Sequence, residues 1–152
     1  MAPTATATPD AEAASPKKHR RVLYADDMRE LRDVMHLSLT REGYATECVS
    51  NGALALERLA AGPNFDLVIT DHHMPAMNGL ELITRLRATP FRGKIMIFSS
   101  ELSPAVAADY HKLHVDRILY KPVYPSELRK VLAEVFSTTP PAEAGLGRQG
   151  DR

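Results

Sequence analysis

A strand-like run of apolar residues ends at a carboxylate near the middle of this chain. Residues 65–70 read Phe-Asp-Leu-Val-Ile-Thr, and Asp71 follows them directly. The β-branched run predicts a buried strand, and the turn-forming residues up to Pro75 predict a loop before the next helix. A charge at the carboxyl end of a buried strand is costly unless a cation or a reacting group interacts with it. Asp71 is therefore a candidate functional residue, which the rest of the fold is expected to position.

The composition predicts one folded domain between two tails. The chain has 152 residues, and we expect the domain to span residues 20–137. Residues 1–19 are rich in Ala, Thr and Pro, and residues 138–152 in Pro, Ala, Gly and charged groups. Because neither segment can bury enough apolar surface to offset the entropy lost on ordering, both are predicted to be disordered. The basic run at residues 17–21 is interpreted as a solvated lead-in to the first strand, with an anion-binding arm as the alternative.

The charge balance and the single cysteine limit the function classes. Lys plus Arg number 19 and Asp plus Glu number 19, which weighs against nucleic-acid binding through bulk charge. Cys48 is the only cysteine, so it cannot form an internal disulfide, and its strand-like setting predicts a small buried side chain. No segment has the length and apolarity of a membrane span, and the N-terminus lacks the apolar core of a secretory signal. A soluble cytoplasmic protein is the expectation.

Alternating strand and helix patterns indicate an α/β fold. The five predicted strands are residues 22–25, 44–49, 65–70, 94–98 and 117–120, and a helical pattern follows each of them. Five strands alternating with five helices predict a doubly wound, five-stranded parallel sheet with helices on both faces, in a single domain. Right-handed crossovers place the carboxyl ends of all strands at one edge, where sheets of this kind bind their ligands.

Apolar spacing predicts which helix residues reach the core. The first helix is expected to bury Leu31, Val34, Met35 and Leu39, the second Leu54, Leu56 and Leu59, and the fifth Leu128, Val131, Leu132 and Val135. Ser103 and Pro104 form a favourable N-cap and first-turn pair for the fourth helix. Tyr110 in that helix, together with the fifth strand and the fifth helix, is interpreted as an alternative partner surface.

Four of the five strands end in polar side chains that are suited to the same chemistry, namely Asp26 with Asp27, Asp71, Ser99 and Lys121. Crowded carboxylates repel one another, and a divalent cation relieves that repulsion. Hard oxygen ligands favour Mg2+. A lysine can pair with a phosphoryl oxygen, and a serine hydroxyl can donate a hydrogen bond to another. These groups predict a phosphoryl-transfer site in which Asp71 is the nucleophile, because the other two carboxylates then hold the metal.

With these markers in order, the sequence resembles the receiver domain of the response-regulator family of two-component signalling. The markers are Asp26-Asp27, Asp71 followed by His-His-Met-Pro, Met77-Asn78-Gly79, Ser99-Ser100-Glu101 and Lys121-Pro122. The resemblance covers about residues 20–136, which is most of the chain. It implies a flavodoxin-like fold and, in particular, the stand-alone, chemotaxis-type form of the family.

The resemblance also implies a role for each site residue. Asp71 would be the phosphoacceptor, with Ser99 and Lys121 contacting the phosphoryl group. Mg2+ would be the cofactor, and its ligands would be Asp26, Asp27, Asp71 and the backbone carbonyl of His73. The Lys121-Pro122 peptide bond would be cis. The protein itself would be a phosphoacceptor and not an enzyme, apart from self-phosphorylation and slow autodephosphorylation.

The sequence also departs from the family pattern. Ile118 stands three positions before Lys121, where the family often has an aromatic residue coupled to the movement of the serine or threonine. Tyr120 lies beside the lysine, and the aromatic role does not transfer to it. Ser100 replaces the usual alanine. His73 and Glu101 occupy the positions that influence hydrolysis of the acyl phosphate, and they are predicted to interact across the mouth of the site.

The expected function is that of a single-domain response regulator. It would receive its phosphoryl group from a sensor histidine kinase and signal by contact with a downstream protein, with no nucleic-acid or membrane partner. A phosphorelay intermediate that passes the group to a histidine phosphotransfer protein would use the same site. An Mg2+-dependent phosphohydrolase of the haloacid dehalogenase type is disfavoured, because His73 stands where such enzymes carry a second aspartate. A degenerate receiver used as a scaffold is disfavoured because all the acidic site residues are present.

The adjacent pair His72 and His73 invites a comparison with zinc sites. Two histidines next to each other in sequence need at least one further ligand at a suitable spacing, and the sequence offers none nearby. We therefore interpret the pair as part of the loop structure.

Asp71 taken alone also has an alternative interpretation as a helix-capping or strand-end carboxylate, which the accompanying aspartates and lysine disfavour.

Overall fold

Five parallel strands form one sheet in the order β2-β1-β3-β4-β5. The computed structural model describes residues 20–137, so the predicted disorder of residues 1–19 and 138–152 lies outside the described residues. The strands are β1 (Arg21–Ala25), β2 (Ala45–Val49), β3 (Leu67–Thr70), β4 (Lys94–Ser99) and β5 (Arg117–Tyr120). The helices are α2 (Arg29–Arg41), α3 (Gly52–Ala61), α4 (Gly79–Arg87), α5 (Pro104–Lys112) and α6 (Pro125–Ser137). The predicted doubly wound, flavodoxin-like architecture is confirmed.

The strand order reverses between β1 and β3, because the chain runs outward to β2 before it returns to the far side of β1. The register pairs Ala25 with Thr70, the last residues of β1 and β3. Asp26 and Asp71 are the next residues after the two strands, and the Asp71 amide donates to the Ala25 carbonyl at 2.9 Å. The switch point of the sheet is therefore where the two carboxylates meet.

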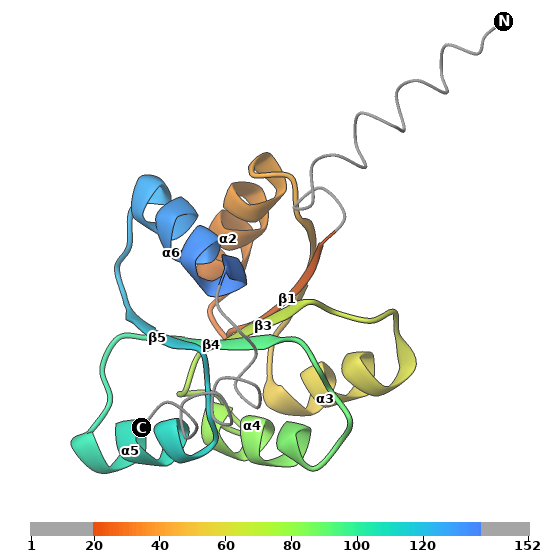
Figure 1. The fold of residues 1–152 in the computed structure, drawn as a ribbon, viewed down its shortest axis with the longest axis vertical. Helices are drawn as coiled ribbons and strands as arrows, with labels where there is room; N and C mark the ends of the chain where they lie inside the picture. The colour runs from red at the N-terminus through yellow and green to blue at the C-terminus, as the bar shows by residue number, and fades with distance from the viewer. Residues whose placement is uncertain (1–19, 138–152) are drawn as a thin grey trace, which may run out of the picture.

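Helices cover both faces of the sheet: α2 and α6 lie on one face, and α3, α4 and α5 lie on the other (Figure 1). Alternation along β1 shows why both faces need cover. Val22 and Tyr24 belong to the hydrophobic core under α2 and α6, whereas Leu23 and Ala25 belong to the core under the other three helices. A strand that is buried on both sides needs a continuous apolar run, which is the pattern in its sequence.

The side chains of asparagine and serine fix the starts of three helices. Asn51 accepts from the Leu54 amide at 2.9 Å, and Asn78 accepts from the Glu81 amide at 2.9 Å. Ser103 accepts from the Val106 amide at 3.2 Å, with Pro104 in the first turn. These contacts satisfy amides that have no partner within the helix. The predicted cap of the helix after β4 is therefore confirmed.

Two of the predicted core positions are wrong. Val34 is 57% exposed because the buried stripe of α2 runs through Met35 and Leu39, which are one turn apart. Leu54 is 40% exposed because α3 packs through Gly52 and Ala55 instead.

The contact of α3 is close enough to exclude a larger side chain. A Cβ on Gly52 would lie 2.8 Å from the Met77 carbonyl oxygen, so only glycine allows the start of α3 to approach the loop after β3 this closely. β3 also begins at Leu67, two residues later than predicted, although Phe65 before it is buried in the core. The chain enters the strand after Asp66, which pairs with Arg21 through its backbone amide and its side chain.

Candidate functional site

Three aspartates gather at the carboxyl ends of β1 and β3. One carboxylate oxygen each from Asp26, Asp27 and Asp71 lies within 4.8 Å of the others. Asp26 and Asp71 are buried, while Asp27 is exposed. Among residues 20–137 this is the one such group of three potential metal ligands. The parallel sheet therefore brings together the three carboxylates that the sequence singled out.

Asp26 is held from several sides and is completely buried. Its Oδ2 accepts a hydrogen bond from the Tyr24 hydroxyl at 2.6 Å and from Lys121 Nζ at 2.9 Å. Its Oδ1 accepts from the Met28 amide at 2.9 Å, and its backbone carbonyl accepts from Arg32 Nη1 at 2.8 Å. Burial and the bond to Asp26 both raise the pKa of Tyr24, so its phenol stays a neutral donor. Sequence reasoning missed Tyr24, because a strand tyrosine is usually a packing residue.

Asp71 has fewer partners. The His72 amide donates to its Oδ1 at 2.8 Å, and Lys121 Nζ lies 3.4 Å from its Oδ2. Thr70 Oγ1 donates to the Asp71 carbonyl at 2.9 Å and fixes the backbone, not the carboxylate. One carboxylate oxygen of Asp71 therefore faces the lysine across a distance longer than a normal hydrogen bond.

Lys121 lies between the two buried aspartates and is itself largely buried, with 13% of its side chain exposed. β5 delivers it: Tyr120 pairs with Ser99 in the register of β4 and β5, and the Lys121 amide donates to the Ser99 carbonyl at 2.8 Å. The Lys121-Pro122 peptide bond is cis, as the resemblance implied. The lysine ammonium also lies 5.4 Å from the centre of the Phe98 ring.

Ser99 ends β4 with a buried hydroxyl. The residue is 0% exposed, and its Oγ has no hydrogen-bond partner among residues 20–137. A buried hydroxyl without a partner costs about 1–3 kcal/mol, so it calls for an explanation, such as a bound group that supplies an acceptor. An incoming oxyanion would supply the missing acceptor.

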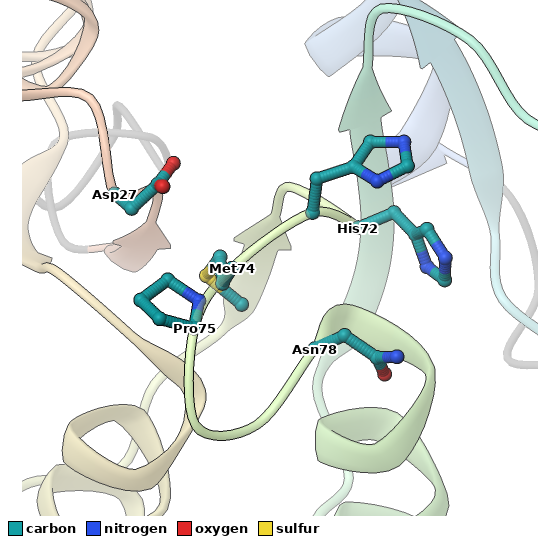
Figure 2. A pocket seen from close by; sticks show the side chains of 6 residues that line it. Asp27, His72, Met74, Pro75 and Asn78 are labelled. Carbon is teal, nitrogen blue, oxygen red and sulfur yellow. The ribbon is translucent and has the colours of Figure 1, made fainter.

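A shallow pocket opens beside the aspartates. Asp27 lies on one side of it, and the loop after β3 forms the other side (Figure 2). His73 in this loop is exposed, and its Nε2 lies 3.3 Å from the backbone carbonyl of Glu101. The predicted interaction between these two residues is thus present, through the main chain of Glu101. The carbonyl of His73 as a metal ligand stays a prediction.

The donor set fits Mg2+. Three carboxylates and one ammonium group give these four side chains a formal charge of −3 + 1 = −2, which one divalent cation balances. All the candidate ligands are oxygens, which Mg2+ prefers, and Asp27 faces the open side. The histidines of the loop are not among the clustered ligands within the described part of the chain.

Tyr110 corrects one expectation. Its alternative interpretation as part of a partner surface is wrong, since the residue is 0% exposed and α5 turns it toward the sheet. Its hydroxyl oxygen lies 2.7 Å from His72 Nδ1, and the two rings meet edge to face. Burial lowers the pKa of His72, with His73 acting in the same direction, which favours a neutral ring. Sequence spacing carries no signal for a polar pairing between residues this far apart along the chain.

The comparison with protein families decides the classification. The family model of the response regulator receiver domain matches residues 22–133. The chain belongs to the response regulator receiver family. Chemotaxis protein CheY1 of Helicobacter pylori is 31% identical over 121 residues, covering 78% of this chain and 98% of CheY1. The rice two-component response regulator ORR11 is 33% identical over 117 residues, covering 76% of this chain and 80% of that protein.

Solved receiver structures share the fold. Chemotaxis response regulator CheY4 of Vibrio cholerae is 28% identical with a TM-score of 0.72, over 77% of this chain and 98% of that one. Response regulator TrrA of Thermotoga maritima, solved in complex with Mg2+ and BeF, is 28% identical with a TM-score of 0.67, over 76% and 98% of the two chains.

Receiver domains also occur within much longer relatives. The sensory/regulatory protein RpfC of Xanthomonas campestris is 30% identical over 123 residues, and the aligned part is 78% of this chain but 17% of RpfC. The sensor histidine kinase AruS of Pseudomonas aeruginosa is 31% identical over 159 residues, which is 15% of that protein. This chain therefore spans only a small part of both relatives. In residues 20–137, no helix has the length and apolarity needed to cross a membrane.

Proposed function

We propose that this receiver domain accepts a phosphoryl group on Asp71 from the phosphohistidine of a sensor histidine kinase, with Mg2+, and signals through protein–protein contacts. The observation that carries the proposal is the arrangement around Asp71. Its Oδ2 faces Lys121 at 3.4 Å and lies beside the other two aspartates. The Ser99 hydroxyl, which has no hydrogen-bond partner within residues 20–137, is at the same edge of the sheet.

The reaction gives each side chain a distinct role. An oxygen of Asp71 attacks phosphorus, a new O–P bond forms, the N–P bond of the phosphohistidine breaks, and the imidazole leaves with its bonding electron pair. The product is an acyl phosphate. Lys121 pairs with a phosphoryl oxygen, and Ser99 donates its hydroxyl proton to another in a hydrogen bond. Tyr24 and Met28 keep the Asp26 carboxylate in place throughout.

The candidate metal ligands are Asp26, Asp27, Asp71 and the His73 carbonyl. When bound there, Mg2+ would offset the negative charge that otherwise repels an incoming phosphoryl group. The lysine contributes the remaining positive charge beside the two buried carboxylates. In this scheme the domain is a phosphoacceptor and catalyses nothing beyond its own phosphorylation and dephosphorylation.

The proposed partners are proteins of the cytoplasm: a histidine kinase and a downstream target. The equal numbers of basic and acidic residues support protein partners over nucleic acid. A relay role, in which Asp71 passes the group to a histidine phosphotransfer protein, would use the same side chains. Adding such a protein to the phosphorylated domain separates the two roles, because only a relay intermediate transfers its label rapidly.

Labelling with acetyl phosphate and Mg2+ tests the proposal. Intact-protein mass spectrometry should show one added phosphoryl group that is lost on treatment with hydroxylamine, as expected for an acyl phosphate. Asp71→Asn should abolish the addition, and Asp66→Asn, at an aspartate before the same strand, should leave it unchanged. Equal labelling of wild type and Asp71→Asn would contradict the proposal.

A further inference from the structure

α5 packs on the core through one fully buried residue and through partly buried neighbours such as Val106. Tyr110 is the one buried residue of α5, and its ring lies in the core shared with α3 and α4. By contrast, α6 buries four apolar residues. The position of α5 therefore depends more on one contact than that of α6 does.

The polar end of this anchor reaches the loop that carries the phosphoacceptor. The Tyr110 hydroxyl lies 2.7 Å from His72 Nδ1. His72 is the residue directly after Asp71, and its amide donates to Asp71 Oδ1 at 2.8 Å. The His72 carbonyl accepts from the Gly79 amide at 2.9 Å, which fixes the other end of the loop. His72 therefore contacts both the Tyr110 hydroxyl, through its ring, and the Asp71 carboxylate, through its amide.

The structure makes specific room for this contact. A Cβ on Gly79 would lie 2.6 Å from the Tyr110 hydroxyl and 2.5 Å from the Asp71 carbonyl oxygen. Any larger residue at this position would separate the tyrosine from the loop. The start of α4, the tyrosine and the backbone of the phosphoacceptor therefore pack as one unit.

A second contact joins the loop after β3 to the segment just before α5. His73 Nε2 lies 3.3 Å from the Glu101 carbonyl, in the connection between β4 and α5. The rings of His72 and His73 also meet edge to face, with centres 4.8 Å apart. Ile118, at the position where the family often has an aromatic residue, packs against the same core as Tyr110 and offers no polar group.

We infer that Tyr110 is a positioning residue for the Asp71 site: through His72 it sets the loop after β3, and it links the loading of that site to α5. This inference rests on the proposed function and adds a residue outside the acidic cluster to it. By reciprocity, if loading of the Asp71 site changes the affinity of α5 for a partner, that partner changes the affinity of the site for its ligand by the same factor. The contact between Tyr110 and His72 is a single hydrogen bond, so Tyr110→Phe can remove it while the aromatic ring stays packed in the core.

Amide NMR on the 15N-labelled domain tests this inference without requiring phosphorylation. Titration with Mg2+ alone gives a dissociation constant, and addition of beryllofluoride then loads the phosphoryl position. Wild type should show shifts both in the β3–α4 loop and in α5. Tyr110→Phe should weaken Mg2+ binding by about fivefold, which is the size expected for the loss of one buried hydrogen bond. In this variant the amide shifts in α5 should be smaller than in wild type, while the shift at Asp71 should persist.

Matched variants separate positioning from packing. Tyr120→Phe makes the same chemical change at an exposed tyrosine on β5 and should match wild type. His72→Leu removes the same hydrogen bond from the histidine side and should weaken Mg2+ binding as Tyr110→Phe does. It therefore also tests the inference if Tyr110→Phe folds poorly. The double variant should be no weaker in Mg2+ binding than His72→Leu, because both changes remove the same contact.

Three results would overturn the inference. The first is a Tyr110→Phe variant that is less stable to unfolding but keeps the Mg2+ affinity and the α5 shifts of wild type. The others are a double variant whose loss of Mg2+ affinity is the sum of the two single losses, or a Tyr120→Phe variant that loses as much affinity as Tyr110→Phe. Failure of the proposed function looks different. A wild type that binds Mg2+ but is never labelled by acetyl phosphate contradicts phosphotransfer, and the Mg2+ comparison among the variants still decides the role of Tyr110.

Discussion

The ends of β1 and β3 lie side by side and each carries a buried aspartate, yet the two carboxylates are held very differently. Asp26 accepts from a phenol, an ammonium group and a backbone amide. Asp71 accepts from one amide and faces the same ammonium group at the longer distance of 3.4 Å. The difference agrees with the two roles that we propose for these carboxylates. A carboxylate held by several donors suits the proposed role of a fixed ligand, whereas one with fewer donors suits the proposed role of a nucleophile.

The largest effect should come from removing the reactive carboxylate. Asp71→Asn is expected to lose all labelling by acetyl phosphate, whereas Tyr24→Phe, which loosens the fixed carboxylate, should keep it. Mass spectrometry of both variants under the same conditions measures this. Retained labelling in Asp71→Asn would remove the distinction between the two strand ends.

For unfolding stability, substitution of Asp26 should have a larger effect than substitution of Asp71, which is the reverse of their effects on labelling. Asp26→Ala leaves a buried lysine with only its more distant partner and should cost about 3 kcal/mol. Asp71→Ala relieves repulsion among the aspartates and should change stability by less than about 1 kcal/mol without Mg2+. Urea unfolding in a chelating buffer measures both. Equal costs would mean that the extra hydrogen bonds at Asp26 contribute nothing.

Metal binding should stabilise the domain only when both strand ends are intact. Mg2+ at about 100 times its dissociation constant should raise the unfolding free energy by about 2.7 kcal/mol. Asp27→Asn, which changes an exposed member of the cluster, should weaken this gain without affecting the metal-free protein. Thermal unfolding with and without Mg2+ gives the comparison, and NaCl at matched ionic strength provides a control for general ionic effects.

The tyrosine on β1 should have a smaller effect. Tyr24→Phe keeps the ring in the core and removes a hydrogen bond to a charged acceptor, which should cost about 1.5 kcal/mol. Tyr120→Phe, at an exposed residue, is the control and should cost nothing measurable. If both variants unfold at the same urea concentration, the phenol does not help to hold Asp26.

The smallest effect concerns the single cysteine. Cys48 pairs with Tyr24 in the register of β1 and β2, and burial raises the pKa of its thiol to about 11. The thiol should therefore react slowly with a disulfide reagent at pH 8, and faster as the pH rises toward that value, because the thiolate is the nucleophile. Asp26→Ala should accelerate the reaction at pH 8 by loosening the end of β1, and Asp71→Ala should not.

Most of the site could be predicted because it depends on rules that act along the chain. Apolar runs with short helical segments between them predict a parallel sheet, and a parallel sheet brings Asp26, Asp71 and Lys121 to one edge whatever the details of packing. The roles of the side chains at that edge then followed from charge and from the resemblance to a family.

The remaining part depends on contacts between distant segments. Tyr110 is a helix residue whose spacing fits either a buried or a partner-facing side, and only the packed structure shows that it points to His72. Val34 failed for a related reason, since one residue of rotation separates the buried stripe of α2 from solvent. Tyr24 was missed because its hydroxyl matters only once Asp26 is beside it.

The outward-facing side of α5 has a consequence for redesign. Ala105, Ala108, His111 and Lys112 are exposed in this helix, so their side chains can be exchanged without entering the core. Exchanging them for the corresponding residues of another receiver should change the partner contacts that α5 can make, and it should leave the Asp71 site unaltered. The inner side of the helix, with Tyr110 and Val106, would keep its packing against the core while the outer side is changed.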